Sequence, residues 1–267
     1  MALTDAEVAA APVAERRHES DRGAWGAAER APHPQLQAHM LGYQGYWEDS
    51  PGPQRRRHLP SGSVTLILGA DPLRLLSGPG GGGTYHAFVA GMHETPAVSE
   101  HDGRQSGMEV SLTPLGARCL LAVPMHEVAN AVVPLDDLLG RPAGELADRL
   151  GSAGGWADRF AAVDDVLLRL AAAGPTAVPQ VAWAWRQLQG AHGDRVIGSL
   201  ASELGWSRRH LAERFRHEVG LGPKAVARVL RFQRAVEMLD GWTPGGGGGP
   251  RPAGTGPRPS LADVAAR

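Results

Sequence analysis

Residues 195–239 read RVIGSLASELGWSRRHLAERFRHEVGLGPKAVARVLRFQRAVEML, and this stretch decides the fold of the C-terminal part of the chain. It predicts a short helix over residues 197–204, a sharp turn at Gly205, and a second helix after Ser207. Gly205 supplies the positive φ that the turn requires, and the Ser207 hydroxyl can cap an unpaired N–H of the second helix. The apolar residues at helical spacing are Leu200, Ala201, Leu204, Leu211 and Phe215. We therefore predict a helix-turn-helix with a long supporting helix behind it.

The second helix of this motif carries a polar face opposite its apolar residues. Arg209 could hydrogen-bond a guanine, Glu213 could accept from a cytosine amino group, and the Ala212 methyl could contact a thymine methyl. Arginines on the flanks of this face are placed to meet phosphates. The predicted DNA-binding residues are Ser207, Arg208, Arg209, Ala212, Glu213 and Arg216. The alternative is an arginine-rich amphipathic helix whose polar face is only solvated.

The turn, the apolar spine and the following helix resemble the first half of an AraC-type DNA-binding domain. That family has a Gly-aromatic-Ser turn, Leu and Phe in the recognition helix, a Gly-x-x-Pro break and an Arg-x-x-x-Ala linker helix. The matching residues are Gly205, Trp206, Ser207, Leu211, Phe215, Gly220, Pro223, Arg231 and Ala235. The resemblance implies that Arg209, Ala212 and Glu213 occupy base-reading positions and that double-stranded DNA is a partner.

The AraC family has two such motifs, and residues 260–267 resemble only the beginning of the second. We expect the Gly/Pro-rich linker at 243–259 to be flexible and the stub after it to be poorly ordered. A single motif makes few phosphate contacts. The alternative function is therefore a ligand-binding or oligomerisation protein whose DNA binding is impaired because the second motif is truncated.

Composition excludes several other classes of protein. The chain has 267 residues, a formal net charge of −1 and 42 % hydrophobic residues, which suits one or two globular domains. Its one cysteine, Cys119, excludes an internal disulfide and is expected to be a buried structural thiol. No apolar stretch reaches the ~18 residues of a membrane span, and the N-terminus has no signal pattern. We expect a cytoplasmic protein with no membrane partner.

In the N-terminal half, the pattern of apolar residues changes near residue 35. Residues 1–34 show no clear apolar period, and we expect a disordered tail. Beyond them, short apolar or alternating runs are separated by Gly, Pro and Asp, which predicts an antiparallel barrel or sandwich. The runs are 63–68, 85–90, 108–113 and 119–123. The glycines at 80–83 predict a hairpin tip or a loose loop rather than a phosphate-binding loop, because the strand and helix of such a loop are missing.

Part of this region resembles the N-terminal domain of a subset of actinobacterial AraC-type regulators. The residues that carry the resemblance are Val110, Leu112, Pro114, Gly116, Ala117, Pro124, Val133, Pro134, Leu135, Asp137 and Leu138. It implies a cupin-like fold over roughly residues 35–150 and supplies no ligand. Residues 136–190 then have a helical period. These helices either pair two protomers, as in regulators of this architecture, or pack within one chain.

Histidines in the predicted barrel raise the question of a metal site. The candidates are His39, His58, His86, His93, Glu94 and His101. No H-x-H pair exists, and neighbours in a strand point to opposite faces, so we predict surface or hydrogen-bonded histidines and no metal or other cofactor. We find no catalytic signature and expect no enzyme. Aromatic and Met side chains could line a ligand pocket or simply form the core: Tyr43, Tyr46, Trp47, Phe88 and Met92.

We therefore predict an α+β protein with an N-terminal β-rich cupin-like barrel or sandwich, linker helices and a C-terminal all-α helix-turn-helix domain. We expect it to be a sequence-specific transcriptional regulator whose N-terminal domain senses a ligand or dimerises. A small-molecule effector and a second copy of the chain remain candidate partners, the effector's site being unknown. The expected parts are a tail at 1–34, a sensing domain at 35–135, linker helices at 136–190, a helix-turn-helix domain at 191–242, a linker at 243–259 and a stub at 260–267.

Overall fold

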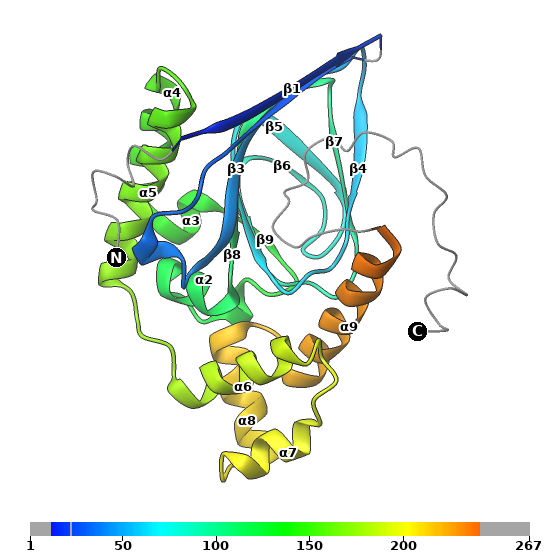
Figure 1. The fold of residues 1–267 in the computed structure, drawn as a ribbon, viewed down its shortest axis with the longest axis vertical. Coiled ribbons are helices and arrows are strands. Elements are labelled where there is room, and N and C mark those ends of the chain that lie inside the picture. The colour runs from blue at the N-terminus through cyan, green and yellow to red at the C-terminus, as the bar shows by residue number, and fades with distance from the viewer. Residues whose placement is uncertain (1–11, 22, 241–267) are drawn as a thin grey trace.

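The computed structural model describes residues 12–21 and 23–240, and it confirms the predicted α+β architecture (Figure 1). An antiparallel sheet of nine strands comes first, and helices follow. The strands are β1 (Ala14–Ser20), β2 (Gly23–Glu29), β3 (Met40–Asp49), β4 (Gln54–His58), β5 (Val64–Ser77), β6 (Gly83–Ala90), β7 (Ala97–His101), β8 (Arg104–Leu112) and β9 (Val132–Pro134). The described helices are η1 (Pro34–Leu36), α2 (Pro114–Leu121), η2 (Met125–Glu127), α3 (Leu135–Leu139), α4 (Arg141–Ser152), α5 (Trp156–Ala173), α6 (Pro179–Gly190), α7 (Ile197–Glu203), α8 (Arg208–Val219) and α9 (Pro223–Asp240).

The sheet runs in the order β1-β2-β3-β8-β5-β6-β9, and β7 pairs with both β5 and β4. Strand β5 pairs with three strands, and its pairing with β6 has an irregularity between Leu68 and Leu73. Its first part pairs with β8 and its last part pairs with β7. The β5–β6 connection holds Gly78, Gly80 and Gly81 at positive φ, which confirms the predicted hairpin tip.

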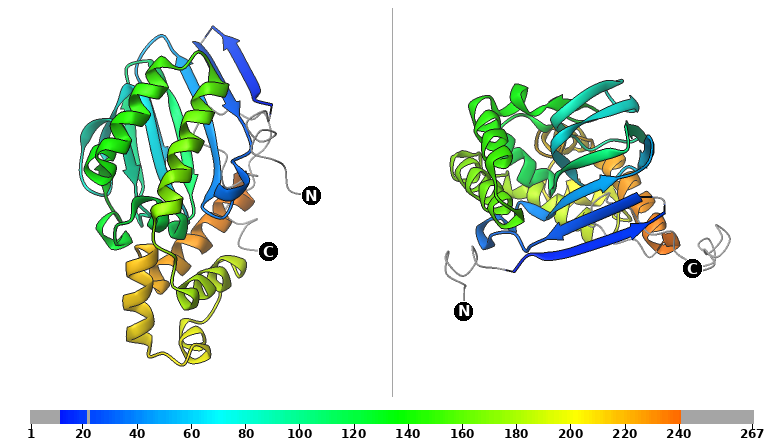
Figure 2. Two further views of the ribbon diagram at one scale, coloured as in Figure 1. Left: turned by 90° about the vertical axis from the view of Figure 1, so that its left-hand side faces the viewer. Right: turned by 90° about the horizontal axis from the view of Figure 1, so that it is seen from above.

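One face of the sheet is apolar and is covered by helices. Register places Val64 opposite Leu112 and Leu66 opposite Val110, and all four side chains are buried. Figure 2 shows α4 and α5 lying side by side across this face. The Tyr43 ring meets Phe160 of α5 edge-on, with centroids 4.7 Å apart. Alternation along the first part of β5 thus buries one row of side chains against the helices.

The prediction of a disordered tail is wrong for the described residues before 35. Strands β1 and β2 form an antiparallel hairpin, and β2 continues the sheet by pairing with β3. All seven residues of β1 are exposed, so no apolar alternation marks the strand in the sequence. Backbone pairing with β2 holds the strand instead, helped by an Arg16–Glu29 ion pair and by Arg17 over the Trp47 ring.

The prediction of a strand at 119–123 is also wrong, because most of this apolar run belongs to helix α2. The Thr113 hydroxyl caps this helix by accepting from the Gly116 N–H at 2.9 Å. The helix ends at Ala122, whose φ is +55°. The Cys119 side chain is buried, as expected, and its thiol donates to the Ala171 carbonyl at 3.7 Å. Burial raises the pKa of the Cys119 thiol.

The helical period predicted for residues 136–190 is confirmed by α3, α4, α5 and α6, with a break at Gly140. One continuous cluster of buried residues runs from the sheet through α5 and α6 into α8 and α9. The helices therefore pack within the chain and join its two ends into one core. No helix among the described residues is long and apolar enough to cross a membrane. The predicted linker at 243–259 and stub at 260–267 lie outside the described residues, as do residues 1–11 of the predicted tail.

Candidate nucleic-acid interface

Helices α7 and α8 form the predicted helix-turn-helix at the end of the molecule farthest from β1 (Figure 1). The turn is tight, because the Gly205 N–H donates to Ser202 and the Trp206 N–H donates to Ala201. Gly205 has φ +66°, and a Cβ there would meet nothing within 4 Å. The turn therefore needs glycine for its backbone conformation rather than for space. The Ser207 hydroxyl accepts from the His210 N–H at 3.1 Å, as an N-cap does.

The spine of α8 is buried as the spacing predicts. Leu211, Phe215 and Val219 are fully buried and share one core with Leu200 and Ala201 of α7. Residues three and four apart in a helix lie on one face, so this spine fixes which side of α8 faces outward. This outward side carries the residues that the sequence analysis predicts to contact DNA.

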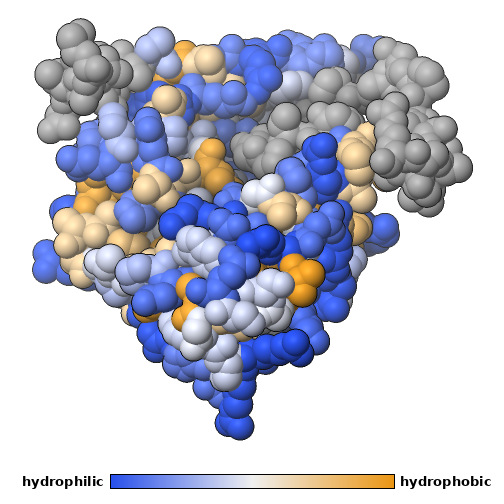
Figure 3. Space-filling model, turned by 60° about the horizontal axis from the view of Figure 1, so that its bottom comes forward, coloured by the Kyte–Doolittle hydropathy of each residue, from blue (hydrophilic) through white to orange (hydrophobic). Residues whose placement is uncertain are grey.

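Five of the six predicted DNA-binding residues are exposed, and Ala212 is half-buried between them. Arg209, Glu213 and Arg216 follow one another at helical spacing on the outward face. Figure 3 looks toward this end of the molecule and shows mainly hydrophilic residues there. The structure thus brings the six residues together on one exposed surface, with Ser207 and Arg208 at the start of α8.

The charged side chains on this surface are held only weakly. Arg209 Nε lies 2.9 Å from Glu213 Oε1, with side chains 89 % and 54 % exposed. An exposed pair of this spacing contributes only about 0.3–0.5 kcal/mol, so both groups can exchange it for other contacts at little cost. Arg208 lies over Gly198 of α7, where a Cβ would come within 2.9 Å of its guanidinium. A glycine at this position leaves room for the arginine.

Three contacts that the sequence did not predict stiffen the motif. The Trp206 and His210 rings meet edge-on with centroids 4.6 Å apart, and their spacing of four residues was the available signal. Arg195 donates to both carboxylate oxygens of Glu203 at 2.7 and 2.9 Å. Arg231 Nη1 donates to the Gly193 carbonyl at 2.6 Å and ties α9 to the segment before α7.

The far end of α8 rests on the β-rich part of the chain. Gly220 ends the helix at φ +102°, and a Cβ there would lie 3.0 Å from the Met125 carbonyl of η2. The His217 ring lies 6.1 Å from the His126 ring between centroids. On α9, Arg228 forms an ion pair with Glu94, and Gln233 accepts from the Gly62 N–H at 2.8 Å. Helix α8 therefore has one free end and one anchored end.

The face of the sheet opposite the helices is polar and lies beneath the β4–β7 pair. Glu48 of β3 forms an ion pair with Arg56 of β4 and lies 3.4 Å from His101 Nε2 of β7. His58 Nε2 lies 2.7 Å from the Ser99 hydroxyl. Burial, followed by the charge of Arg56, lowers the pKa of His58 to about 4.

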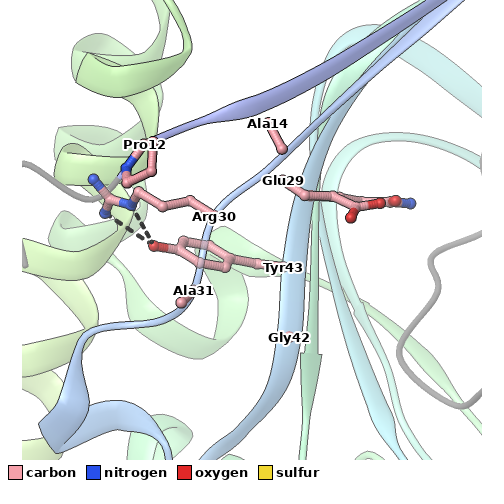
Figure 4. A pocket seen from close by; sticks show the side chains of 8 residues that line it. Pro12, Ala14, Glu29, Arg30, Ala31, Gly42 and Tyr43 are labelled. Atoms are coloured by element: carbon pink, nitrogen blue, oxygen red, sulfur yellow. Dashed lines mark hydrogen bonds between the residues drawn. The ribbon is translucent and has the colours of Figure 1, made fainter.

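The predicted ligand-pocket residues do not line one pocket. Tyr43 belongs to the core beneath α5, whereas Tyr46 lies on the opposite face of β3, beside Gly107. A cavity of about 390 Å³ lies beside the end of β2, and it is lined by Pro12, Ala14, Glu29, Arg30, Ala31, Gly42, Tyr43 and Gln44 (Figure 4). Arg30 and Tyr43 are hydrogen-bonded to each other there, at 2.9 Å. No group of three or more His, Cys, Asp or Glu side chains converges as metal ligands in residues 12–21 and 23–240.

Comparison with known proteins finds two similarities. The family described as a domain of unknown function (DUF6597) matches residues 28–134, from within β2 to the last residue of β9. No curated protein matches the chain. The crystal structure of the AraC-like transcriptional activator CuxR is similar with a TM-score of 0.33 and 15 % identity, over 84 % of this chain and 87 % of that chain.

Proposed function

We propose that this protein is a sequence-specific DNA-binding transcriptional regulator of AraC type. The observation that carries the proposal is the geometry of α7 and α8. A buried spine of Leu211 and Phe215 fixes an outward face with Arg209, Glu213 and Arg216 on it. A helix that enters the major groove needs such a face, free of other protein and able to touch base edges.

The contacts proposed for this face divide into two kinds. Arg209 and Glu213 lie near the middle of the free surface and would read bases. Their mutual ion pair is exposed and weak, so they can give it up for contacts with base edges. Arg208 and Arg216 would meet phosphates and orient the helix without carrying sequence information. One motif makes few phosphate contacts, so we propose that a second copy of the chain adds a second motif on the same duplex.

The β-rich part is proposed as the sensing domain. Its polar face buries side-chain groups that have no hydrogen-bond partner among the described residues, namely Gln44 Nε2 and His101 Nδ1. Leaving buried polar groups unpaired costs free energy, and a bound molecule or water would recover it. We propose that a small-molecule effector binds against this face.

Fluorescence anisotropy of the full chain tests the DNA proposal. The protein is titrated onto a duplex selected from a random pool, at two salt concentrations and with competitor DNA. We expect sequence-preferring binding that survives the competitor and weakens with salt. Binding that shows no preference and vanishes at the higher salt concentration would contradict the proposal and favour a protein with impaired DNA binding.

A further inference from the structure

Asn130 joins two loops of the β-rich part. Its backbone N–H donates to the Met92 carbonyl at 2.8 Å, and its side-chain Oδ1 accepts from the Glu94 N–H at 3.0 Å. Asn130 has φ +53°, a left-handed conformation that asparagine tolerates better than most residues. The Gly91 N–H adds a bond to the Ala131 carbonyl at 3.1 Å. The segment at 91–94 and the segment at 128–131 are therefore held as one unit.

This unit touches the DNA-binding part at two points. The segment at 128–131 continues directly from η2, since the Ala129 N–H donates to the Met125 carbonyl at 3.0 Å. That same carbonyl supports the end of α8, where a Cβ on Gly220 would approach it to 3.0 Å. Glu94 forms its ion pair with Arg228 of α9. A shift of the unit would therefore press on both α8 and α9.

The unit also carries His93, whose ring lies near His58 of β4. His93 Nδ1 lies 3.2 Å from the Gly91 carbonyl, which can only accept, so Nδ1 carries the proton. In the neutral ring, Nε2 is then left as an acceptor. Nε2 is buried and has no hydrogen-bond partner among the described residues. Burial lowers the pKa of His93, which favours the neutral ring. His93 is also close enough to His58 to help lower the pKa of that ring.

We propose that His93 Nε2 receives an O–H or N–H donor of the effector and that Asn130 transmits this contact to the recognition helix. The inference rests on the proposed function, because it concerns regulation of the same DNA-binding surface. His93 and Glu94 are neighbours in the chain: His93 contacts the ligand, and Glu94 forms the ion pair with α9. A ligand that moves His93 moves Glu94 and Asn130 with it, and η2 carries the displacement to Gly220.

The test removes the Asn130 side chain without disturbing its backbone. Asn130→Gly keeps the left-handed conformation available and loses Oδ1, whereas Asn130→Asp keeps an acceptor oxygen and serves as the matched control. Hydrogen exchange is measured on the full chain. We expect Asn130→Gly to speed exchange at residues 216–220 and 124–131 by threefold or more, and Asn130→Asp to change it less than twofold. Unchanged exchange at 216–220 in Asn130→Gly would overturn the proposal.

A second variant, His93→Ala, changes the side chain that is proposed to contact the ligand. We expect His93→Ala to change exchange at residues 216–220 by threefold or more in the wild-type background and by less than 1.5-fold when Asn130→Gly is already present. Equal effects in the two backgrounds would show that Asn130 does not transmit the change. Because the effect of His93→Ala is compared between two backgrounds, a loss of stability that Asn130→Gly causes by itself cancels.

DNA affinity is measured on the same variants to separate the two proposals. If the wild-type chain shows no sequence-preferring binding, the proposed function fails, and the exchange results still decide the coupling. If the wild type binds its selected duplex, we expect Asn130→Gly to change that affinity threefold or more and Asn130→Asp to leave it within twofold. Normal DNA affinity in Asn130→Gly together with unchanged exchange would reject the coupling alone.

Discussion

Arg30 and Asp164 stand 134 residues apart in the sequence and form a buried ion pair between the end of β2 and the middle of α5. Their side chains are only 1 % and 8 % exposed. The Tyr43 hydroxyl accepts from Arg30 at 2.9 Å and donates to Asp164 at 3.0 Å, so the three groups satisfy one another. Burial raises the pKa of the Asp164 carboxyl, while Arg30 and Tyr43 act in the opposite direction.

Removing one member of this pair should destabilise the protein strongly. Asp164→Ala leaves the Arg30 charge buried without its partner, and we expect it to cost about 3–5 kcal/mol in the free energy of unfolding. Urea unfolding followed by circular dichroism measures the change. The control is Arg16→Ala, which breaks the exposed Arg16–Glu29 pair and should cost less than about 1 kcal/mol. Equal losses in the two variants would contradict the role of burial.

Two glycine-to-alanine changes should have opposite signs. Gly205→Ala forces a Cβ into the left-handed turn between α7 and α8, and we expect a loss of about 1–2 kcal/mol. Gly144→Ala changes a position inside α4 where a Cβ meets nothing within 4 Å, and it should stabilise the protein by about 0.5–1 kcal/mol. Urea midpoints of both variants are compared with the wild type. A stabilising Gly205→Ala would show that the turn is not built as described.

Stability should fall in mild acid because of the buried histidines. The folded-state pKa of His58 lies near 4, below its ordinary value of 6.5, so the folded state binds fewer protons than the unfolded chain between these values. The contribution of His58 is complete above about pH 6.5 and is lost as the pH falls, amounting to about 3 kcal/mol by pH 4. The pKa values of His93 and His101 are lowered by burial too, and they act in the same direction.

Urea midpoints between pH 7.5 and pH 4.5 check this prediction. His58→Gln should flatten part of the slope, because glutamine offers a polar group that does not titrate. His86→Gln is the control, since His86 is exposed on β6. A slope that His58→Gln leaves unchanged would mean that other groups cause the loss of stability in acid.

Two arginines on α8 should differ in what they contribute to DNA binding. Arg209→Ala should cost about 1–3 kcal/mol of affinity and relax base preference at one position, because it removes a base contact. Arg216→Ala should weaken binding to every sequence alike and lower the salt dependence by about one unit of slope. Fluorescence anisotropy on the selected duplex and on its single-base variants measures both effects.

The matched control for these variants is Arg57→Ala, which removes the same charge from an exposed position on β4, at the other end of the molecule from α8 in Figure 1. It should leave the affinity within about twofold, since a lost charge at that distance is largely screened. If Arg57→Ala lowers affinity as much as Arg209→Ala does, the loss reflects net charge. The assignment of the recognition face would then be wrong.

The helix-turn-helix could be predicted from the sequence because the interactions that define it are local. Gly205 turns the chain, Ser207 caps the next helix within three residues, and Leu211 and Phe215 are one helical turn apart. Each signal reports on neighbours in the chain, so no distant partner is needed to interpret it. The helices between 136 and 190 were predictable for the same reason.

The tertiary structure alone decided the features that depend on distant partners. Strand β1 has no apolar period of its own; it pairs with β2, which β3 holds in the sheet, and its Arg17 lies over the distant Trp47 ring. The run around Cys119 belongs to helix α2, whose apolar residues pack against α5 and α8. The close approach of Gly220 to η2 and the ion pair between Arg30 and Asp164 join residues that are far apart in the chain. Burial and pairing of this kind follow from the folded arrangement, and they leave no periodic pattern in the sequence.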